Sequence, residues 1–362
     1  MKITVSAGPH TRKNAVCSLK LKNCALASGD YLLVPEKGNA VAASVCCCGE
    51  DSEISFVLDY LGANETVAFD LVSVSSAPRM TAEVGENGVK IFDNGVFVTE
   101  YYTGTNLAKP YMGPFTDRYG ADVTRLDFEI KEHPHHRSLW VSHGDVNGVD
   151  TWNEPKDTHG YIRNQAIRDV VSGSVLTAFT ADNLWTDHSG NALLDETTVY
   201  KLYATDASTT VVDVTITLKA TYGEVTLGST KEAGPLAVRM AESLKVKNTG
   251  TMKSGVGGIN EDEIWMKKAP WVDYYGTTEG RVCGVAMFDH PTNDSFPTYW
   301  HARDYGLMAV NNFYRGGAKV IAAGDAMQFT YRVVIHNGDT ETAAIGAMYA
   351  DYATPVQVKV EA

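Results

Sequence analysis

An alternation of apolar and polar residues with a period of two recurs along almost the whole chain, and this pattern restricts the fold to β-structure. In the clearest example, residues 211–218 read VVDVTITL, and every second residue is apolar. Similar runs occupy residues 54–58, 66–74 and 327–336. Asn94-Gly95 lies between two apolar runs and predicts a tight hairpin. We therefore expect an all-β chain built as a large antiparallel β-sandwich.

Helical periodicity is convincing only near the C-terminus, over residues 339–353. There Ala344, Met348 and Tyr352 recur at the spacing of one helix face, and Thr340 is the expected N-cap. The sequence therefore predicts one C-terminal helix beside the strands.

The chain divides near residue 78. Its 362 residues suffice for one large β domain or two ordinary domains. Nine of the ten histidines and all six tryptophans follow that point. We predict a small N-terminal β subdomain over residues 1–78, and a large sandwich domain over residues 79–362 that carries the functional site.

The charge balance limits the partners. Lys and Arg number 31 against 44 Asp and Glu, which gives a formal net charge of -13. An acidic protein repels nucleic-acid phosphate and anionic membrane surfaces. No stretch approaches the ~20 apolar residues that span a bilayer. We therefore predict neither a nucleic-acid partner nor a membrane partner.

The spacing of the six cysteines indicates whether the protein resides in an oxidising or a reducing compartment. They stand at positions 17, 24, 46, 47, 48 and 283 without a Cys-x-x-Cys spacing. Adjacent strand residues point to opposite faces, so Cys46-Cys47-Cys48 is a poor disulfide framework and reduced thiols are expected. The N-terminus MKITVSAGPH also lacks the apolar core of a signal peptide. Both observations predict a cytoplasmic protein.

Polar and aromatic residues of the kinds that form active sites concentrate in three segments. The first lies within residues 109–154 and reads HPHHRSLWVSHGDVNGVDTWNE over 133–154. The second is NEDEIWMKKAPWVDYY at 260–275, and the third is FDHPTNDSFPTYWHARDYGL at 288–307. Binding pockets place a few polar groups on apolar and aromatic walls. We therefore expect the three segments to converge on one site.

The segments supply candidates for particular roles. Imidazole titrates near neutral pH, so the candidate general acids and bases are His136, His143 and His301. The carboxylates that could orient an imidazole or share its proton transfer are Asp145, Glu263 and Asp304. Candidate substrate-binding residues are Arg137, Arg303, Trp140, Asn147, Trp265, Trp271, Trp300 and His290. Arginine forks suit a carboxylate, a keto group or hydroxyls, and indole rings suit the apolar faces of a sugar.

If these segments are extended strands, the directions of their side chains follow from the alternation along a strand. His133 and His135 then point one way, and His136 points the other way. His301 and Arg303, two residues apart in a predicted strand, share one face.

The three segments resemble a bacterial family of domains of unknown function that is often labelled PmoA-like. The likeness rests on residues 133–154 and 288–307, on KKAPWVDYYG (267–276) and on FTYRVVIHNGD (329–339). It implies a sandwich similar to the galactose-mutarotase type and a role in carbohydrate catabolism. The label itself implies a methane-oxygenase subunit, which is an integral membrane protein. The absence of a membrane span in this sequence contradicts that function.

Three functional hypotheses follow. The first is an enzyme that acts on a sugar or glycoside by histidine and carboxylate acid–base chemistry, in hydrolysis, elimination or epimerisation. The second is a non-catalytic carbohydrate-binding protein. The third is a metal-dependent oxygenase or hydrolase with His133 and His135 as ligands, so a divalent metal stays open although no cofactor is predicted. Nucleophile-elbow, Walker and His-Glu-x-x-His motifs are absent.

Overall fold

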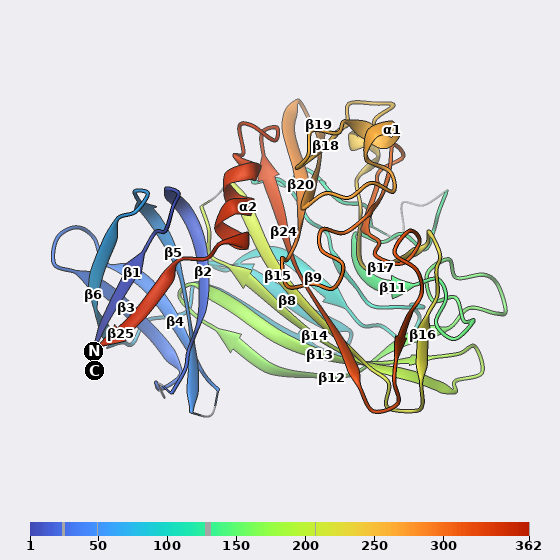
Figure 1. Ribbon diagram of the computed structural model, residues 1–362, viewed down its shortest axis with the longest axis horizontal. Helices are drawn as coiled ribbons and strands as arrows, with labels where there is room; N and C mark the ends of the chain where they lie inside the picture. The colour runs from blue at the N-terminus through green and yellow to red at the C-terminus, as the bar shows by residue number, and fades with distance from the viewer. Residues whose placement is uncertain (24–25, 49, 127–131, 207, 362) are drawn as a thin grey trace.

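The computed structural model describes residues 1–23, 26–48, 50–126, 132–206 and 208–361 (Figure 1). Its strands form one seven-stranded sheet, two eight-stranded sheets and one two-stranded sheet. Neighbouring strands pair antiparallel, as between β14 (Ala192–Tyr203) and β15 (Thr209–Lys219). The prediction of an all-β, sandwich-like fold is confirmed.

Sheet A forms the N-terminal unit, with its own apolar core. Its strands are β1 (Lys2–Ser6), β2 (Arg12–Leu21), β3 (Gly29–Pro35), β4 (Val41–Cys48), β5 (Asp51–Leu61), β6 (Thr66–Val74) and β25 (Gln357–Glu361). β25 is the last strand of the chain and pairs with β1, so the two termini lie together in Figure 1. The end of the range predicted for the large domain therefore belongs to the N-terminal sheet.

Sheets B and C form the large sandwich. Sheet B contains β7 (Met80–Gly85), β8 (Gly88–Asp93), β9 (Val96–Tyr102), β10 (Tyr111–Gly113), β11 (Leu139–His143), β17 (Ala233–Arg239), β21 (Trp300–Arg303) and β22 (Leu307–Val310). Sheet C contains β14 and β15 with β12 (Tyr161–Ser172), β13 (Leu176–Thr186), β18 (Thr251–Ser254), β19 (Trp271–Thr278), β20 (Arg281–Asp289) and β24 (Ala326–Asn337). The small sheet pairs β16 (Val225–Leu227) with β23 (Lys319–Ile321).

The main core lies between sheets B and C. In β15, the alternate residues Val212, Val214, Ile216 and Leu218 are all buried in it, as the period-two pattern predicts. Sheet B contributes residues such as Met112, Leu139 and Val238 from its inner face. Because strand side chains alternate, the neighbours of these residues point to the outer face of sheet B.

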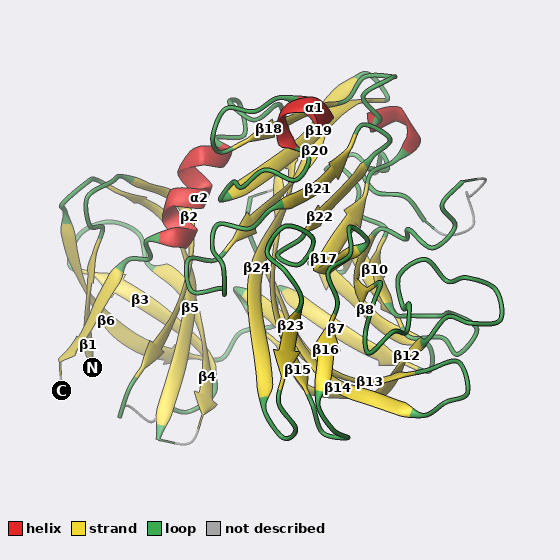
Figure 2. Cartoon of the chain, turned by 45° about the vertical axis from the view of Figure 1, so that its right-hand side comes forward, coloured by secondary structure: helices red, strands yellow, loops and turns green. Residues whose placement is uncertain are grey.

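Two α-helices occur among the described residues (Figure 2). The C-terminal α2 (Ile345–Ala353) packs with β2 and β24 in one apolar cluster. It begins six residues later than predicted, after Ala344 in the left-handed conformation. Thr340 does not cap it, because its hydroxyl donates to Asp273 Oδ2 at 2.6 Å. The short helix α1 (Asn260–Ile264) lies in a segment that was not expected to be helical.

Among the described residues, no helix is long and apolar enough to cross a membrane.

The thiols give a first testable prediction. Cys17 and Cys283 are buried free thiols, and burial raises the pKa of each to about 12. The side chains of Cys24, Cys47 and Cys48 lie outside the described part of the chain. We expect six reduced cysteines, because alternation along β4 separates consecutive thiols. Intact-mass analysis after alkylation of the denatured, non-reduced protein should count six adducts; a count of four or fewer would reveal a disulfide.

Candidate functional site

The outer face of sheet B brings together residues from distant parts of the sequence. Cross-strand partners form one row of Tyr102, Tyr111, Trp140, Ala237, Ala309 and His301. Residues opposite one another in such a row lie on the same face. The small side chains of Ala237 and Ala309 therefore stand between Trp140 on β11 and His301 on β21. This places members of the first and third segments on one surface.

Arg239 occupies the next row, opposite Leu307, which is in turn opposite Arg303. Its side chain is completely buried. Nη1 donates to Nδ1 of His136 at 2.9 Å, Nη2 pairs with Glu132, and the guanidinium lies 4.8 Å from the Tyr305 ring. Since Nδ1 of His136 accepts this hydrogen bond, the neutral imidazole carries its proton on Nε2.

The segment around His136 is a turn, not an extended chain. The His136 N–H donates to the His133 carbonyl at 3.0 Å, and His133 has a φ of 47°. The rings of Tyr305, His133, His136 and Trp140 lie nearly parallel, with neighbouring centroids 4.7, 5.2 and 5.2 Å apart. The predicted opposite directions of His133 and His136 are therefore wrong, because the turn folds both rings over the same face.

Burial, reinforced by neighbouring positive charge, keeps His135 and His136 neutral. Burial and the neighbouring His135 and Arg239 lower the pKa of His136 well below its usual 6.5. Burial and Lys109 lower the pKa of His135 to about 3. At neutral pH these imidazoles can donate or accept a hydrogen bond but carry no charge.

Two carboxylates of the site are held ionised. The Glu154 carboxylate accepts hydrogen bonds from Lys109 Nζ at 2.6 Å and from Arg137 Nη2 at 2.9 Å. Burial alone would raise its pKa, but the two cations lower it to about 2. Burial would also raise the pKa of Glu132, but its contacts with His133, Lys245 and Arg239 lower that pKa to about 2. Neither carboxyl group can serve as a proton donor at neutral pH.

β21 presents His301 and Arg303 on the outer face, as their spacing predicts. His301 is 2% exposed, and burial lowers its pKa to about 4. The Lys231 backbone lies near the ring, but neither ring nitrogen makes a well-formed hydrogen bond with any residue that the structure describes. A buried polar group without a partner is costly, and it marks a position where a ligand can complete the hydrogen bonding.

Arg303 joins the second and third segments. Its Nε lies 2.9 Å from Glu261 Oε1, and its guanidinium lies 5.8 Å from the Trp265 ring and 5.4 Å from the Tyr305 ring. The indole N–H of Trp265 is buried and has no hydrogen-bond partner among the described residues. Contacts from His136 through Arg239, Tyr305 and Arg303 to Trp265 therefore connect all three segments.

Several candidates of the first segment lie away from this cluster. His143 points to the inner face, where its ring meets Phe313 at 4.6 Å and Nε2 lies 3.0 Å from the Gly228 carbonyl. Asp145 accepts from the Gly148 N–H, and Asn147 bonds to the backbone of residues 224 and 226. These contacts place His143, Asp145 and Asn147 apart from the cluster on sheet B, and their predicted roles stay predictions.

Candidates of the other two segments are also displaced. Trp300 is fully buried on the inner face, and its indole N–H donates to the Ala269 carbonyl at 2.9 Å. Asp304 accepts from the Glu261 N–H at 3.0 Å, and Glu263 accepts from the Ile259 N–H at 2.9 Å, so both carboxylates hold the start of α1.

Two further candidates lie against α2. Trp271 packs at the edge of the cluster that α2 forms with β2 and β24. His290 has its ring 5.1 Å from that of Tyr352, and its Nδ1 lies 2.7 Å from the Thr292 hydroxyl. Neither residue contacts the cluster on sheet B.

The sequence analysis assigned no role to several residues of the cluster, although some of them lie in the three segments. These unassigned residues are Tyr102, Lys109, Tyr111, Arg125, Glu132, Trp152, Glu154, Arg239, Lys245 and Tyr305. Arg239 had a visible signal, because it ends the apolar strand AGPLAVR, where a charged residue must find a buried partner. Trp140 is buried, and the His136 ring stacks on it with the centroids 5.2 Å apart.

Within the described ranges, no group of three or more His, Cys, Asp or Glu side chains could hold a metal ion. His133, one of the two suggested ligands, faces Glu132 and Tyr305.

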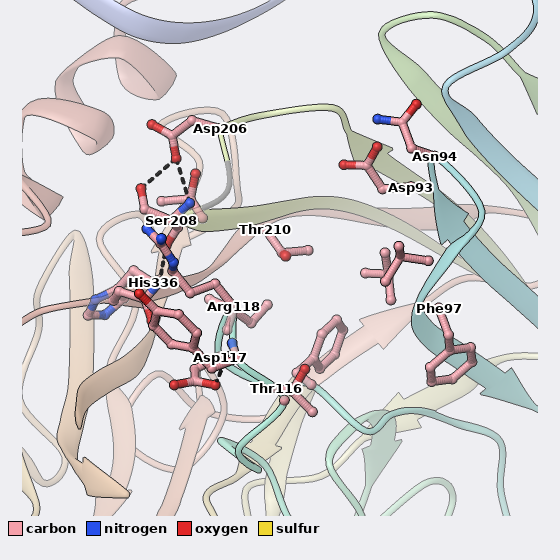
Figure 3. Close-up of a pocket in the computed structure, with 18 of the residues that line it drawn as sticks. Asp93, Asn94, Phe97, Thr116, Asp117, Arg118, Asp206, Ser208, Thr210 and His336 are labelled. Carbon is pink, nitrogen blue, oxygen red and sulfur yellow. Dashed lines mark hydrogen bonds between the residues drawn. The ribbon is translucent and has the colours of Figure 1, made fainter. Parts of the chain in front are cut away.

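Two large hollows lie elsewhere. One hollow, of about 740 Å³, lies between β4 and the strands β12 to β14, and its lining includes Asp30, Cys46 and Lys201. The other, of about 610 Å³, lies at one end of the sandwich between the β8–β9 turn and the ends of β15 and β24 (Figure 3). Among its charged groups, Arg79 pairs with Asp93 at 2.7 Å and Asp117 pairs with Arg281 at 2.6 Å, while the Arg118 guanidinium lies 4.7 Å from the Tyr119 ring. We place the candidate site on sheet B, because residues of the first and third segments share its outer face and Arg303 links them to the second segment.

Comparison with known proteins identifies the family of this chain, and that family has no known function. No curated protein matches the chain. An α-galactosidase from Lactobacillus brevis is similar in structure with a TM-score of 0.34 and 10% identity, over 74% of this chain and 40% of that one. A GH36 α-galactosidase from Geobacillus stearothermophilus, in complex with raffinose, gives a TM-score of 0.35 and 12% identity, over 72% and 40%. The chain thus spans about two fifths of these enzymes.

A family of unknown function, DUF6807, matches residues 88–350, a range that contains the whole cluster on sheet B. This match covers more than half of the sequence, and the chain therefore belongs to the DUF6807 family.

Proposed function

We propose that this protein is a carbohydrate-active enzyme that uses a neutral histidine on sheet B for proton transfer. The observation that carries the proposal is His301, neither of whose ring nitrogens makes a well-formed hydrogen bond with a described residue although the side chain is 2% exposed. Burying such a group costs free energy, which is tolerated where the group takes part in chemistry. An uncharged imidazole is the form that can accept a proton.

The surroundings of His301 suit a sugar. Trp265, Tyr305 and Tyr314 are only partly covered, and their rings can pack on the apolar faces of a pyranose. The indole N–H of Trp265 is a donor for a sugar hydroxyl or for a charged substituent. The likeness to PmoA-like domains, and through them to mutarotase-type sandwiches, agrees with this choice and stays a prediction.

The state of Glu132 and Glu154 argues against either of them as the acid of a hydrolytic carboxylate pair. That hydrolysis needs one carboxyl group that is protonated at working pH. Glu132 and Glu154 both have a pKa of about 2 in their ion pairs. Elimination and epimerisation need a base that removes a proton from carbon, and His301 can supply it.

The test is turnover of a panel of glycosides and oligosaccharides, followed by mass spectrometry and NMR. We expect a product that forms with and without a metal chelator. Binding without any product would favour a non-catalytic carbohydrate-binding protein. Loss of turnover in the chelator, restored by one divalent metal, would favour a metal-dependent enzyme.

A further inference from the structure

The outer face of sheet C carries polar residues that the rest of the protein covers. In β15, Asp213 and Thr215 alternate with apolar residues of the main core, so their side chains point away from that core. Across the strand pair, Asp213 lies opposite Arg332, and Thr215 lies opposite Thr330. An alternating antiparallel strand often turns such a face to water, but the side chains of Asp213 and Arg332 are only 16% and 7% exposed. These polar groups must therefore find partners in the protein or in a ligand.

A cavity of about 200 Å³ lies over these residues, where the N-terminal sheet and α2 meet sheet C. Its wall includes Val16 and Ser18 from β2 and Tyr352 from α2. His290, one of the predicted binding residues, lines it as well. The Thr292 backbone N–H donates to Nδ1 of His290 at 3.2 Å, so the neutral imidazole carries its proton on Nε2.

Tyr352 is held firmly in this wall. Its ring lies 4.7 Å from the Arg332 guanidinium and 5.1 Å from the His290 ring. Asp213 in turn accepts hydrogen bonds from Nε and Nη2 of Arg332 at 2.6 and 2.8 Å. The residue is 8% exposed, and its hydroxyl has no hydrogen-bond partner among the described residues. A fixed and buried hydroxyl of this kind marks a position where a ligand can complete the hydrogen bonding.

The charges around the cavity are matched. The carboxylates of its wall are Glu53, Asp213 and Asp351. Their cation partners, in the same order, are Lys201 at 2.5 Å, Arg332 at 2.6 Å and Arg12 at 3.1 Å. His10 lies 3.2 Å from Asp351, and farther out Lys20 and Asp289 add one charge of each sign. Burial lowers the pKa of His290 below its usual 6.5, so this imidazole is neutral. The wall therefore offers hydrogen bonds without a demand for a charged ligand.

We propose that this cavity binds a single neutral sugar ring, whose hydroxyls form hydrogen bonds with Tyr352, Thr215 and Thr330. Sugar hydroxyls both donate and accept, as the hydroxyls of the wall do. Val16, Val199 and the Tyr352 ring supply apolar surface for the C–H groups of the sugar. The volume is below the about 300–1,000 Å³ of sites for larger ligands, which favours one ring over an oligosaccharide.

This site goes beyond the proposed function and does not depend on it. The cavity lies on the outer face of sheet C, whereas His301 lies on the outer face of sheet B, with the main core between the two sheets. Its occupant would contact sheet A, sheet C and α2 together. Binding therefore favours the state in which the N-terminal sheet is docked, and the midpoint of thermal unfolding should rise with ligand concentration.

The test is calorimetric titration with neutral rings at millimolar concentration: glucose, galactose, mannose, xylose and myo-inositol. Glucuronate and glucosamine are the charged ligands of similar shape. We expect at least one neutral ring to bind more tightly than both charged ones and to raise the unfolding midpoint. Tyr352→Phe should weaken its binding by about 2–10-fold, the contribution of one hydrogen bond. Adding Thr330→Val, which keeps the shape and removes a second hydroxyl, should weaken binding further.

Tyr331→Phe is the matched control. The Tyr331 hydroxyl is also buried without a partner among the described residues, but Tyr331 lies on the inner face of β24 in the main core. This variant should bind as the wild type does, and thermal unfolding should show that both phenylalanine variants fold. Wild-type affinity in Tyr352→Phe, an equal loss in Tyr331→Phe, tighter binding of a charged ligand or no binding of any neutral ring would overturn the proposal. Affinity lost in His301→Leu but kept in Tyr352→Phe would place the sugar on sheet B, and the proposed function would then survive alone.

Discussion

Replacing His301 with leucine should lower turnover by about 10²–10⁴-fold, the usual contribution of a general acid or base. The fold should survive the change. Leucine fills much of the ring's volume and removes two nitrogens that have no hydrogen-bond partner among the described residues. Each unsatisfied buried polar group costs about 1–3 kcal/mol, so the midpoint of thermal unfolding should stay or rise. Turnover and unfolding must be measured on the same purified variant.

His143→Leu is the matched control. His143 is as buried as His301, and burial lowers its pKa to about 4 as well. It differs in direction and bonding, since it faces the inner side of sheet B and its Nε2 lies within hydrogen-bond distance of the Gly228 carbonyl. Its loss should lower stability by about 1–3 kcal/mol and leave turnover per folded molecule unchanged. The reverse pattern in the two variants would show that His301 is structural.

The positions of several strands were predictable from the sequence, because apolar and polar residues alternate along a strand with one buried face. Residues 211–218 fall in β15 with their apolar face in the core, and Asn94-Gly95 makes the turn between β8 and β9. The start of α2 was not predictable in this way. Thr340 is a good N-cap residue by type, but a tertiary contact with Asp273 takes its hydroxyl. The pairing of β25 with β1 is likewise a long-range contact without a local signal.

Alternation also explains which site residues could be predicted. It puts His301 and Arg303 on one face, which the register of β21 and β22 confirms. The same rule puts Trp300 on the opposite face, so Trp300 and His301 could not both line one site. Residue type alone favoured Trp300, although a tryptophan in a strand is as well suited to the core.

Turns and long-range partners account for what the sequence analysis missed. The turn at His133 reverses the expected directions of the rings, and a left-handed residue of this kind is hard to foresee from type. Arg239 lies 103 positions from its partner His136, and nothing near it in sequence announces that contact. The chemistry of the cluster therefore depends on pairings between strands that residue spacing does not encode.

Acid should destabilise the protein as the pH falls from 6.5 toward 4. His143 and His301 have a pKa of about 4 in the folded state and about 6.5 when unfolded. Below pH 6.5 the unfolded state therefore binds more protons, and stability is lost as the pH falls toward 4. Each buried histidine should cost about 3 kcal/mol over this window, and His136 acts in the same direction. Asp289 opposes them, because burial raises its folded pKa to about 6.

Denaturant unfolding at pH 7.0, 6.0, 5.0 and 4.5 checks this prediction, with about 1.4 kcal/mol per pH unit for each proton that the unfolded state binds in excess. Asp289 gains a proton in the folded state below pH 6 and should cancel about one histidine. We therefore expect a net fall in the free energy of unfolding, steepest between pH 6.5 and 4.5. In His301→Leu the slope should be shallower by about one proton, because one neutral buried imidazole is gone. A free energy that is flat over this range, or the same slope in wild type and variant, would show that His301 is not held neutral by burial.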